Sequence, residues 1–132
     1  ARAPAGRAPR CVTLDQVDAE TQIAPRQDTQ VRVCPDFHAA IELIGKRWAG
    51  AILWTLTLGP HYFSDIARAI PGLSDRLLSQ RLQELENEGL IERTVHPGSP
   101  PRVSYALTRK GSELGPAIRE LDRWAKRWQS SG

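Results

Sequence analysis

The stretch that most constrains the fold of this chain is residues 73–108. It opens with Leu78, Leu82 and Leu85 at helical spacing and with polar side chains on the other faces, which predicts an amphipathic helix. Ser74 is suited to cap the free N–H groups of this helix, and Gly89 to end it in a left-handed conformation. The stretch therefore begins with a helix that has a marked start, a marked end and one apolar side.

Two segments rich in β-branched residues follow, Ile91–His96 and Arg102–Leu107. Pro97–Pro101 (PGSPP) lies between them and can form neither helix nor ladder, so it is predicted to be a hairpin tip. Upstream, a short amphipathic segment at residues 63–70 is cut off by a Pro-Gly pair. Two short helices across a tight turn, followed by a hairpin, predict a winged helix-turn-helix, in which the second helix enters the major groove and the hairpin flanks it.

Charge is polarised along this second helix. Its first turns carry Asp75, Arg76, Ser79, Gln80 and Gln83 toward solvent, whereas the later turns are acidic. Arginine can bind guanine, and glutamine can bind adenine, through two hydrogen bonds each. Arg76, Ser79 and Gln80 are therefore the candidates for contact with base edges. Gln83 is a weaker candidate, because it lies one helical turn further from the start of the helix. Asp75 could accept from a cytosine amine, but its charge is unfavourable close to phosphates, so it ranks below the other candidates. The alternative is an ordinary amphipathic helix with a solvated polar face.

Further residues are candidates for the DNA backbone. Ser74 and the N–H groups beside it suit a phosphate, as do His61 and Tyr62 before the first motif helix. Arg102, at the base of the hairpin, is placed for the minor groove or a phosphate, or else for a salt bridge within the hairpin. Arg81 can equally pair with an acidic residue one turn along its own helix.

The rest of the chain predicts a mainly α fold with one small β-hairpin. Residues 1–33, rich in Ala, Pro, Arg and Gln, are interpreted as a flexible arm. Pro35 is placed at the first position of a helix that Gly45 ends. Lys46–Leu58 is apolar nearly all round, which is typical of a central core helix.

The C-terminal helix, capped by Thr108, has an apolar stripe longer than one small domain needs to cover its core. Such a stripe predicts contact with a second copy, whereas the alternative is packing on its own domain alone. Pro116 is expected to kink this helix or to begin its second half. The expected dimer forms through the N- and C-terminal helices, by Phe37, Ile41, Leu114, Ile118, Leu121, Trp124 and Trp128.

Composition narrows the function classes. The 132 residues carry 18 basic and 15 acidic side chains, a net charge of +3, so any nucleic-acid binding depends on local placement of charge. No run is long enough for a membrane span or a signal peptide, and a cytoplasmic location is expected. The three histidines (His38, His61, His96) are scattered, and neither a catalytic set nor a glycine-rich phosphate loop is present. We therefore expect no enzyme activity, no cofactor and no metal.

Cys34 is a candidate redox sensor. It precedes Pro35 and so occupies the N-cap, where the helix dipole favours a thiolate. The alternatives are a small capping residue at a dimer interface, or a metal ligand together with His38, although two ligands do not make a site. Cys11, the second cysteine, lies too far into the arm to be assigned as a partner.

From Cys34 to about Trp128 the chain resembles the HxlR family of bacterial transcriptional regulators, relatives of the MarR-type winged-helix proteins. The matching segments are CP, IGKRW, ILWTL and GP, then FSDI and IPGLSDRLLSQRLQELENEGLIERTV, then PPRVSYALTRKG. The resemblance implies a DNA-binding domain over residues 34–129, a homodimer, a roughly palindromic operator, and control of transcription, often as a repressor. Some members of the family use a cysteine at the position of Cys34 to sense oxidants, quinones or aldehydes. The competing function is a winged-helix module that binds protein and not DNA.

Overall fold

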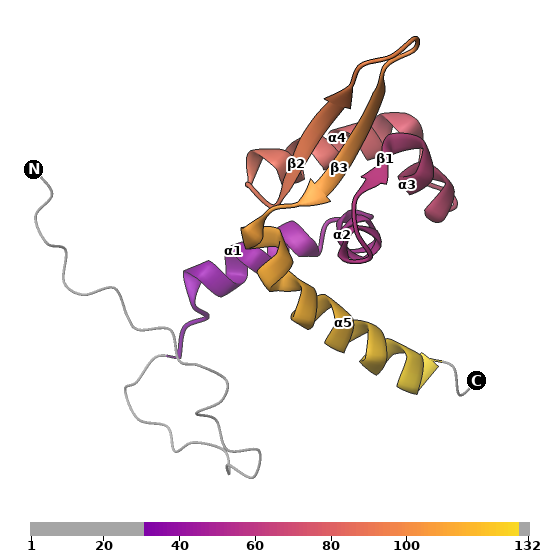
Figure 1. Cartoon of the computed structure of the whole chain (residues 1–132). Helices are drawn as coiled ribbons and strands as arrows, with labels where there is room; N and C mark the ends of the chain where they lie inside the picture. Colours follow the sequence, from indigo (N-terminus) through magenta and orange to yellow (C-terminus); the bar gives the residue numbers. More distant parts are fainter. Residues whose placement is uncertain (1–30, 130–132) are drawn as a thin grey trace, which may run out of the picture. The chain divides into compact units, whose positions relative to one another are not determined.

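The computed structural model describes residues 31–129. The chain divides into two compact units between Leu43 and Ile44, the first holding nearly all of α1 and the second the remaining elements. The predicted arm of residues 1–33 lies almost wholly outside the described residues. Figure 1 shows the elements, which confirm a mainly helical fold with one small sheet: α1 (Pro35–Ile44), α2 (Ala49–Thr57), β1 (His61–Tyr62), α3 (Phe63–Ala69), α4 (Asp75–Asn87), β2 (Ile91–His96), β3 (Arg102–Leu107) and α5 (Arg109–Gln129).

Helix α2 is the central helix of the second unit, as its composition predicts. It contacts α3, α4, β3 and α5, and Ile52, Leu53 and Leu56 are buried on it. The one buried polar side chain of the described core, Thr55, donates its hydroxyl to the carbonyl of Ala51 at 2.9 Å. This bond offsets the cost of taking a hydroxyl out of water.

The start of α2 differs from the prediction. The helix begins at Ala49 and not at Lys46, because Trp48 adopts a left-handed conformation, with φ of 79°, that a helix cannot include. A Cβ placed on Gly72 would lie 3.5 Å from Cη2 of Trp48, so the indole packs beside the turn between α3 and α4. The strained residue thus supports the turn of the helix-turn-helix.

Helix α4 has the predicted bounds and caps. The backbone N–H of Leu77 donates to Oγ of Ser74 at 3.2 Å, and Gly89 has φ of 75° just after the helix. Leu78, Leu82 and Leu85 are fully buried. Truncating a buried leucine to alanine typically costs about 2–5 kcal/mol, so this leucine stripe holds α4 in place.

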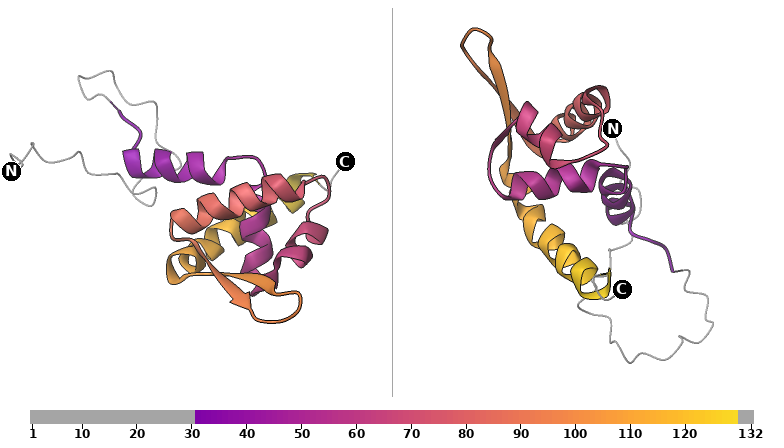
Figure 2. Two further views of the ribbon diagram at one scale, coloured as in Figure 1. Left: turned by 90° about the horizontal axis from the view of Figure 1, so that it is seen from above. Right: turned by 90° about the vertical axis from the view of Figure 1, so that its right-hand side faces the viewer.

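The sheet has three antiparallel strands in the order β1-β3-β2. The predicted hairpin forms β2 and β3, and it projects beyond the helices in both Figure 1 and Figure 2. Strand β1, which the sequence analysis did not predict, pairs His61 with Tyr105 and Tyr62 with Ser104. It runs directly into α3, so the sheet and the helix-turn-helix are joined with no residue between them.

Helix α5 begins where predicted and is capped by Thr108, whose Oγ1 accepts from the N–H of Gly111 at 3.2 Å. It continues through Pro116 to Gln129 as one helix, so the proline does not end it. Figures 1 and 2 show it leading away from the hairpin tip. Within residues 31–129, neither this nor any other helix is apolar over a length that could cross a membrane.

Candidate nucleic-acid interface

The candidate base-reading residues lie on one exposed face of α4. The leucines of the helix are buried on the other side, and the helical period places every polar candidate toward solvent. The Arg76 side chain, on the first turn, makes no hydrogen bond or ion pair with any of residues 31–129. The exposed residues of this reading face are Ser74, Arg76, Ser79, Gln80 and Gln83.

The two glutamines of the reading face already have partners on α4. Nε2 of Gln80 donates to Oε1 of Glu84 at 3.4 Å, and Nε2 of Gln83 donates to Oδ1 of Asn87 at 3.1 Å. A carboxylate only accepts, so the amide nitrogen of Gln80 must face Glu84 and its carbonyl oxygen faces away. Gln80 is thereby turned to present an acceptor, whereas Gln83 is drawn toward the back of the helix.

Glu84 is the centre of a polar cluster that ties α4 to the turn before α2. Its carboxylate meets Nη1 of Arg81 at 3.2 Å and Nζ of Lys46 at 3.3 Å, and Nε of Arg81 donates to the carbonyl of Arg47 at 2.9 Å. The predicted pairing of Arg81 along its own helix is confirmed. Burial by itself raises the pKa of Glu84, but the hydrogen bond from Lys46, the charges of Arg81 and Lys46 and the hydrogen bond from Gln80 together lower that pKa below its ordinary value of 4.5.

At the base of the hairpin, Arg102 stacks on an aromatic ring. Its guanidinium carbon lies 3.5 Å from the ring centroid of Tyr62, and His96 meets the same ring edge-on at 5.4 Å. Among residues 31–129 Arg102 forms no ion pair, so the salt bridge considered as an alternative is not found there. His61 is half-buried, and its Nδ1 donates to the carbonyl of Gly59 at 2.6 Å. Tyr62 and Arg102 therefore lie together, whereas one ring nitrogen of His61 is already engaged.

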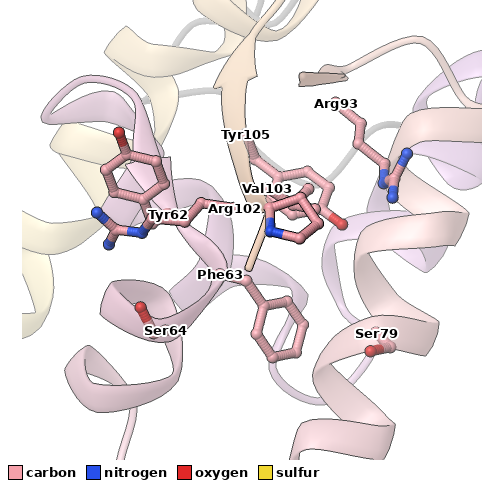
Figure 3. A pocket seen from close by; sticks show the side chains of 9 residues that line it. Tyr62, Phe63, Ser64, Ser79, Arg93, Arg102, Val103 and Tyr105 are labelled. Carbon is pink, nitrogen blue, oxygen red and sulfur yellow. The ribbon is translucent and has the colours of Figure 1, made fainter. Parts of the chain in front are cut away.

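A hollow of about 430 Å³ lies between α4 and the hairpin, and Figure 3 shows the side chains around it. It brings Ser79 of the reading face to the same opening as Tyr62 and Arg102. Arg93 of β2 also lines it and was missed by the sequence analysis. The signal available in the sequence was a charge two residues from both Ile91 and Val95, on the strand face that should be apolar. The lining residues are Tyr62, Phe63, Ser64, Ser79, Arg93, Pro101, Arg102, Val103 and Tyr105.

Cys34 lies at the start of α1, where its carbonyl accepts the first helical hydrogen bond, from the N–H of His38 at 2.9 Å. The side chain is half-buried and disulfide-bonded, so the expected accessible thiolate is not the state that the structure shows. The only other cysteine of the sequence, Cys11, lies outside the described residues. His38 pairs with Glu42 at 2.8 Å, and no group of three or more potential metal ligands occurs within residues 31–129.

The predicted dimer residues divide into exposed and buried ones. On α5, Leu121, Trp124 and Trp128 are 57%, 49% and 68% exposed. Ile118 belongs to the core of its own unit and Leu114 is half-buried, so these two already serve intrachain packing. On α1, considered by itself, Phe37 and Ile41 are exposed.

Comparison with known proteins identifies relatives over most of the chain. YvaP of Bacillus subtilis (strain 168), named an HTH-type transcriptional regulator, is 44% identical over 99 residues, covering 75% of this chain and 92% of YvaP. The HTH-type transcriptional regulator YodB of the same organism is 40% identical over 100 residues, covering 76% of this chain and 89% of YodB.

Solved structures of similar proteins match the same part of the chain. The reduced form of YodB from B. subtilis superposes with a TM-score of 0.65 at 40% identity, covering 76% of this chain and 99% of YodB. YodB has also been solved after diamide treatment and with a quinone bound. The redox regulator HypR in its oxidized form superposes with a TM-score of 0.67 at 31% identity, covering 71% of this chain and 96% of HypR. A family model described as HxlR-like helix-turn-helix matches residues 43–132, and the chain belongs to this family of transcriptional regulators.

Proposed function

We propose that this chain is a sequence-specific DNA-binding transcriptional repressor that acts in the cytoplasm as a homodimer on a near-palindromic operator. Helix α4 enters the major groove and the β2–β3 hairpin flanks it. Arg76, Ser79 and Gln80 contact base edges, and Ser74, Tyr62 and Arg102 contact the backbone. The observation that carries the proposal is the reading face of α4, which is exposed, begins with a cap and an arginine, and stands beside a projecting hairpin.

Salt-dependent binding to duplex DNA tests the proposal. The purified protein would first select fragments from genomic DNA, and its affinity for a selected duplex and a scrambled duplex would then be measured over a series of salt concentrations. A steep negative slope of log affinity against log salt, with tighter binding to the selected duplex, is expected, because each neutralised phosphate contributes about 0.9 to the slope. A slope near zero on both duplexes would contradict DNA binding and leave the protein-binding winged-helix module as the function.

The reading face is tested by Arg76→Ala and Gln80→Ala. Each should weaken binding to the selected duplex by the roughly 1–3 kcal/mol that a bidentate base contact provides, and should change binding to the scrambled duplex much less. Arg123→Ala, on α5, is the matched control and should change neither. Equal losses on the two duplexes would assign these residues to the backbone.

The proposed signal is the redox state of Cys34. In its support, Cys34 is disulfide-bonded in this structure, and the related YodB has been solved in reduced, diamide-treated and quinone-bound forms. When two thiols form a disulfide they lose two electrons and two protons, which an oxidant such as diamide accepts as it is reduced to a hydrazine. Diamide should change DNA affinity of the wild type but not of Cys34→Ser. An equal response of both proteins would exclude Cys34 as the sensor.

A further inference from the structure

We propose that the hollow between α4 and the hairpin is a binding site for a phosphodiester of the DNA backbone, and that Arg93 is its principal cation. This inference rests on the proposed function and extends it to a residue and a contact that the predicted set of DNA-binding residues lacks. Arg93 lines the hollow opposite Arg102, with Ser79 of α4 on one wall (Figure 3).

Arg93 lies at the edge of the buried face of β2. Alternate residues of a strand share a face, so Arg93 lies on the same face of β2 as Ile91, which is fully buried. Arg93 is directly opposite Tyr105, a buried residue, in the register with β3. Arg93 itself is exposed, and so is Val95, two residues further along this face. The guanidinium therefore lies where this face of the sheet emerges from the core into solvent.

None of the described residues neutralises the charge of Arg93. Its guanidinium makes no hydrogen bond or ion pair with any of residues 31–129. The hollow is lined by two arginines and by the hydroxyl groups of Ser64, Ser79 and the tyrosines, and no carboxylate is among its lining residues. The polar side chains of this lining bring hydrogen-bond donors and positive charge but no negative charge, which suits an anion.

The geometry of duplex DNA identifies that anion. The major and minor grooves are separated by the sugar–phosphate backbone. If α4 lies in the major groove and the hairpin reaches the adjacent minor groove, the backbone between them must pass between α4 and the hairpin, over this hollow. Phe63 and Val103 provide apolar wall for a deoxyribose, and the arginines face the phosphates on either side of it.

Salt titrations of Arg93→Gln test this site on the full chain, with a selected and a scrambled duplex. A phosphate contact carries no sequence information, so affinity should fall by the same factor on both duplexes. The slope of log affinity against log salt should decrease by about 0.9 for each subunit, or about 1.8 for a dimer. Arg93→Lys should retain the slope, because a phosphate accepts a point charge.

The matched control is Arg123→Gln, an exposed arginine of α5 that pairs with Glu120 at 2.6 Å, and it should leave the slope unchanged. A wild-type slope that persists in Arg93→Gln would overturn the inference, as would a loss confined to the selected duplex, which would indicate a base contact. A charged side chain can also guard an edge strand against self-association, and aggregation of Arg93→Gln with an unchanged slope would assign that role instead. A thermal shift by inorganic phosphate that requires Arg93, again with an unchanged DNA slope, would assign the hollow to a free anion. Absence of any salt-dependent binding by the wild type would refute the proposed function itself.

Discussion

Glu84 shows how one side chain joins the reading face to the rest of the second unit. Its two oxygens bind a cation on its own helix, Arg81, and a cation on the turn before α2, Lys46, while one oxygen also accepts from Gln80. A carboxylate with three donors holds each of them in a restricted orientation. The conformation of Gln80, a candidate for base contact, is thus linked to a contact between two elements.

Replacing Glu84 with glutamine should remove this cluster at neutral pH and lower the free energy of unfolding by roughly 0.5–1 kcal/mol, the upper range for partly exposed pairs. Because the folded protein lowers the pKa of Glu84 below 4.5, the wild type has this stabilisation above that value and loses it as the pH falls through the folded pKa. Urea unfolding over a pH series should therefore show the two proteins converging in acid. Glu88→Gln, whose carboxylate makes no ion pair with residues 31–129, is the control. A constant difference between Glu84→Gln and wild type at every pH would contradict the linkage.

At the scale of elements, the sequence predicted those segments whose bounds are set by local chemistry. Ser74 and Gly89 delimit α4, and the Pro-rich tip delimits β2 and β3, so these elements have their predicted bounds. Strand β1 was missed because two residues have no periodicity, and they become a strand only through pairing with β3. The start of α2 was misplaced because the left-handed Trp48 is stabilised by packing beside Gly72, a contact distant in sequence.

The candidate site was likewise predictable from the sequence in part. The exposed face of α4 was predictable from helical period, and the structure places all of its candidates there. The position of Arg93 beside the hollow was not predictable from the sequence. Strand alternation assigns a side chain to one face of a strand, but it does not show how far along the strand the helices cover that face. The hollow that Arg93 lines is formed by segments distant in sequence, so it is visible only in three dimensions.

Two glycines of α5 provide a matched test of how the helix is seated. A Cβ on Gly111 would collide with the carbonyl oxygen of Leu90, which is backbone, whereas a Cβ on Gly115 would lie 3.2 Å from the flexible guanidinium of Arg119. Gly111→Ala should therefore lower the melting temperature strongly, since the start of β2 or the start of α5 must shift. Gly115→Ala should lower the melting temperature much less, because only the flexible end of Arg119 must move and the gain in helix propensity opposes the crowding of the new Cβ against Pro116. Thermal unfolding followed by circular dichroism measures both, and equal effects of the two substitutions would contradict the close contact at Gly111.

At the scale of the whole molecule, α5 has an apolar stripe that its own unit does not cover. Leu121, Trp124 and Trp128 follow one another at helical intervals of three and four, and all are about half exposed or more. Contiguous exposed apolar area of this kind is typical of an interface between protein molecules. The stripe supports the proposed homodimer, with α5 as one of its contact surfaces.

Substituting Leu121 and Trp124 with serine should weaken the dimer by 2 kcal/mol or more, about 30-fold in its dissociation constant, if these side chains are the anchors of the interface. Leu58→Ser is the control, since Leu58 is 68% exposed but lies after α2, outside the stripe. Sedimentation over a range of protein concentrations measures the change. Unaltered association of the α5 variant would show that the subunits meet elsewhere.

The short strand β1 has a consequence for the operators that such a protein can use. Since β1 pairs with β3 and continues directly into α3, the hairpin and the helix-turn-helix are held in one rigid arrangement within a subunit. If α4 and the hairpin contact DNA as proposed, the number of base pairs between their two contacts is then a constant of the protein, and a base pair inserted there should weaken binding. In the proposed homodimer, only the spacer between the two halves of an operator would be left to the contact between subunits, so target promoters would diversify through spacer length and base identity, at constant half-site length.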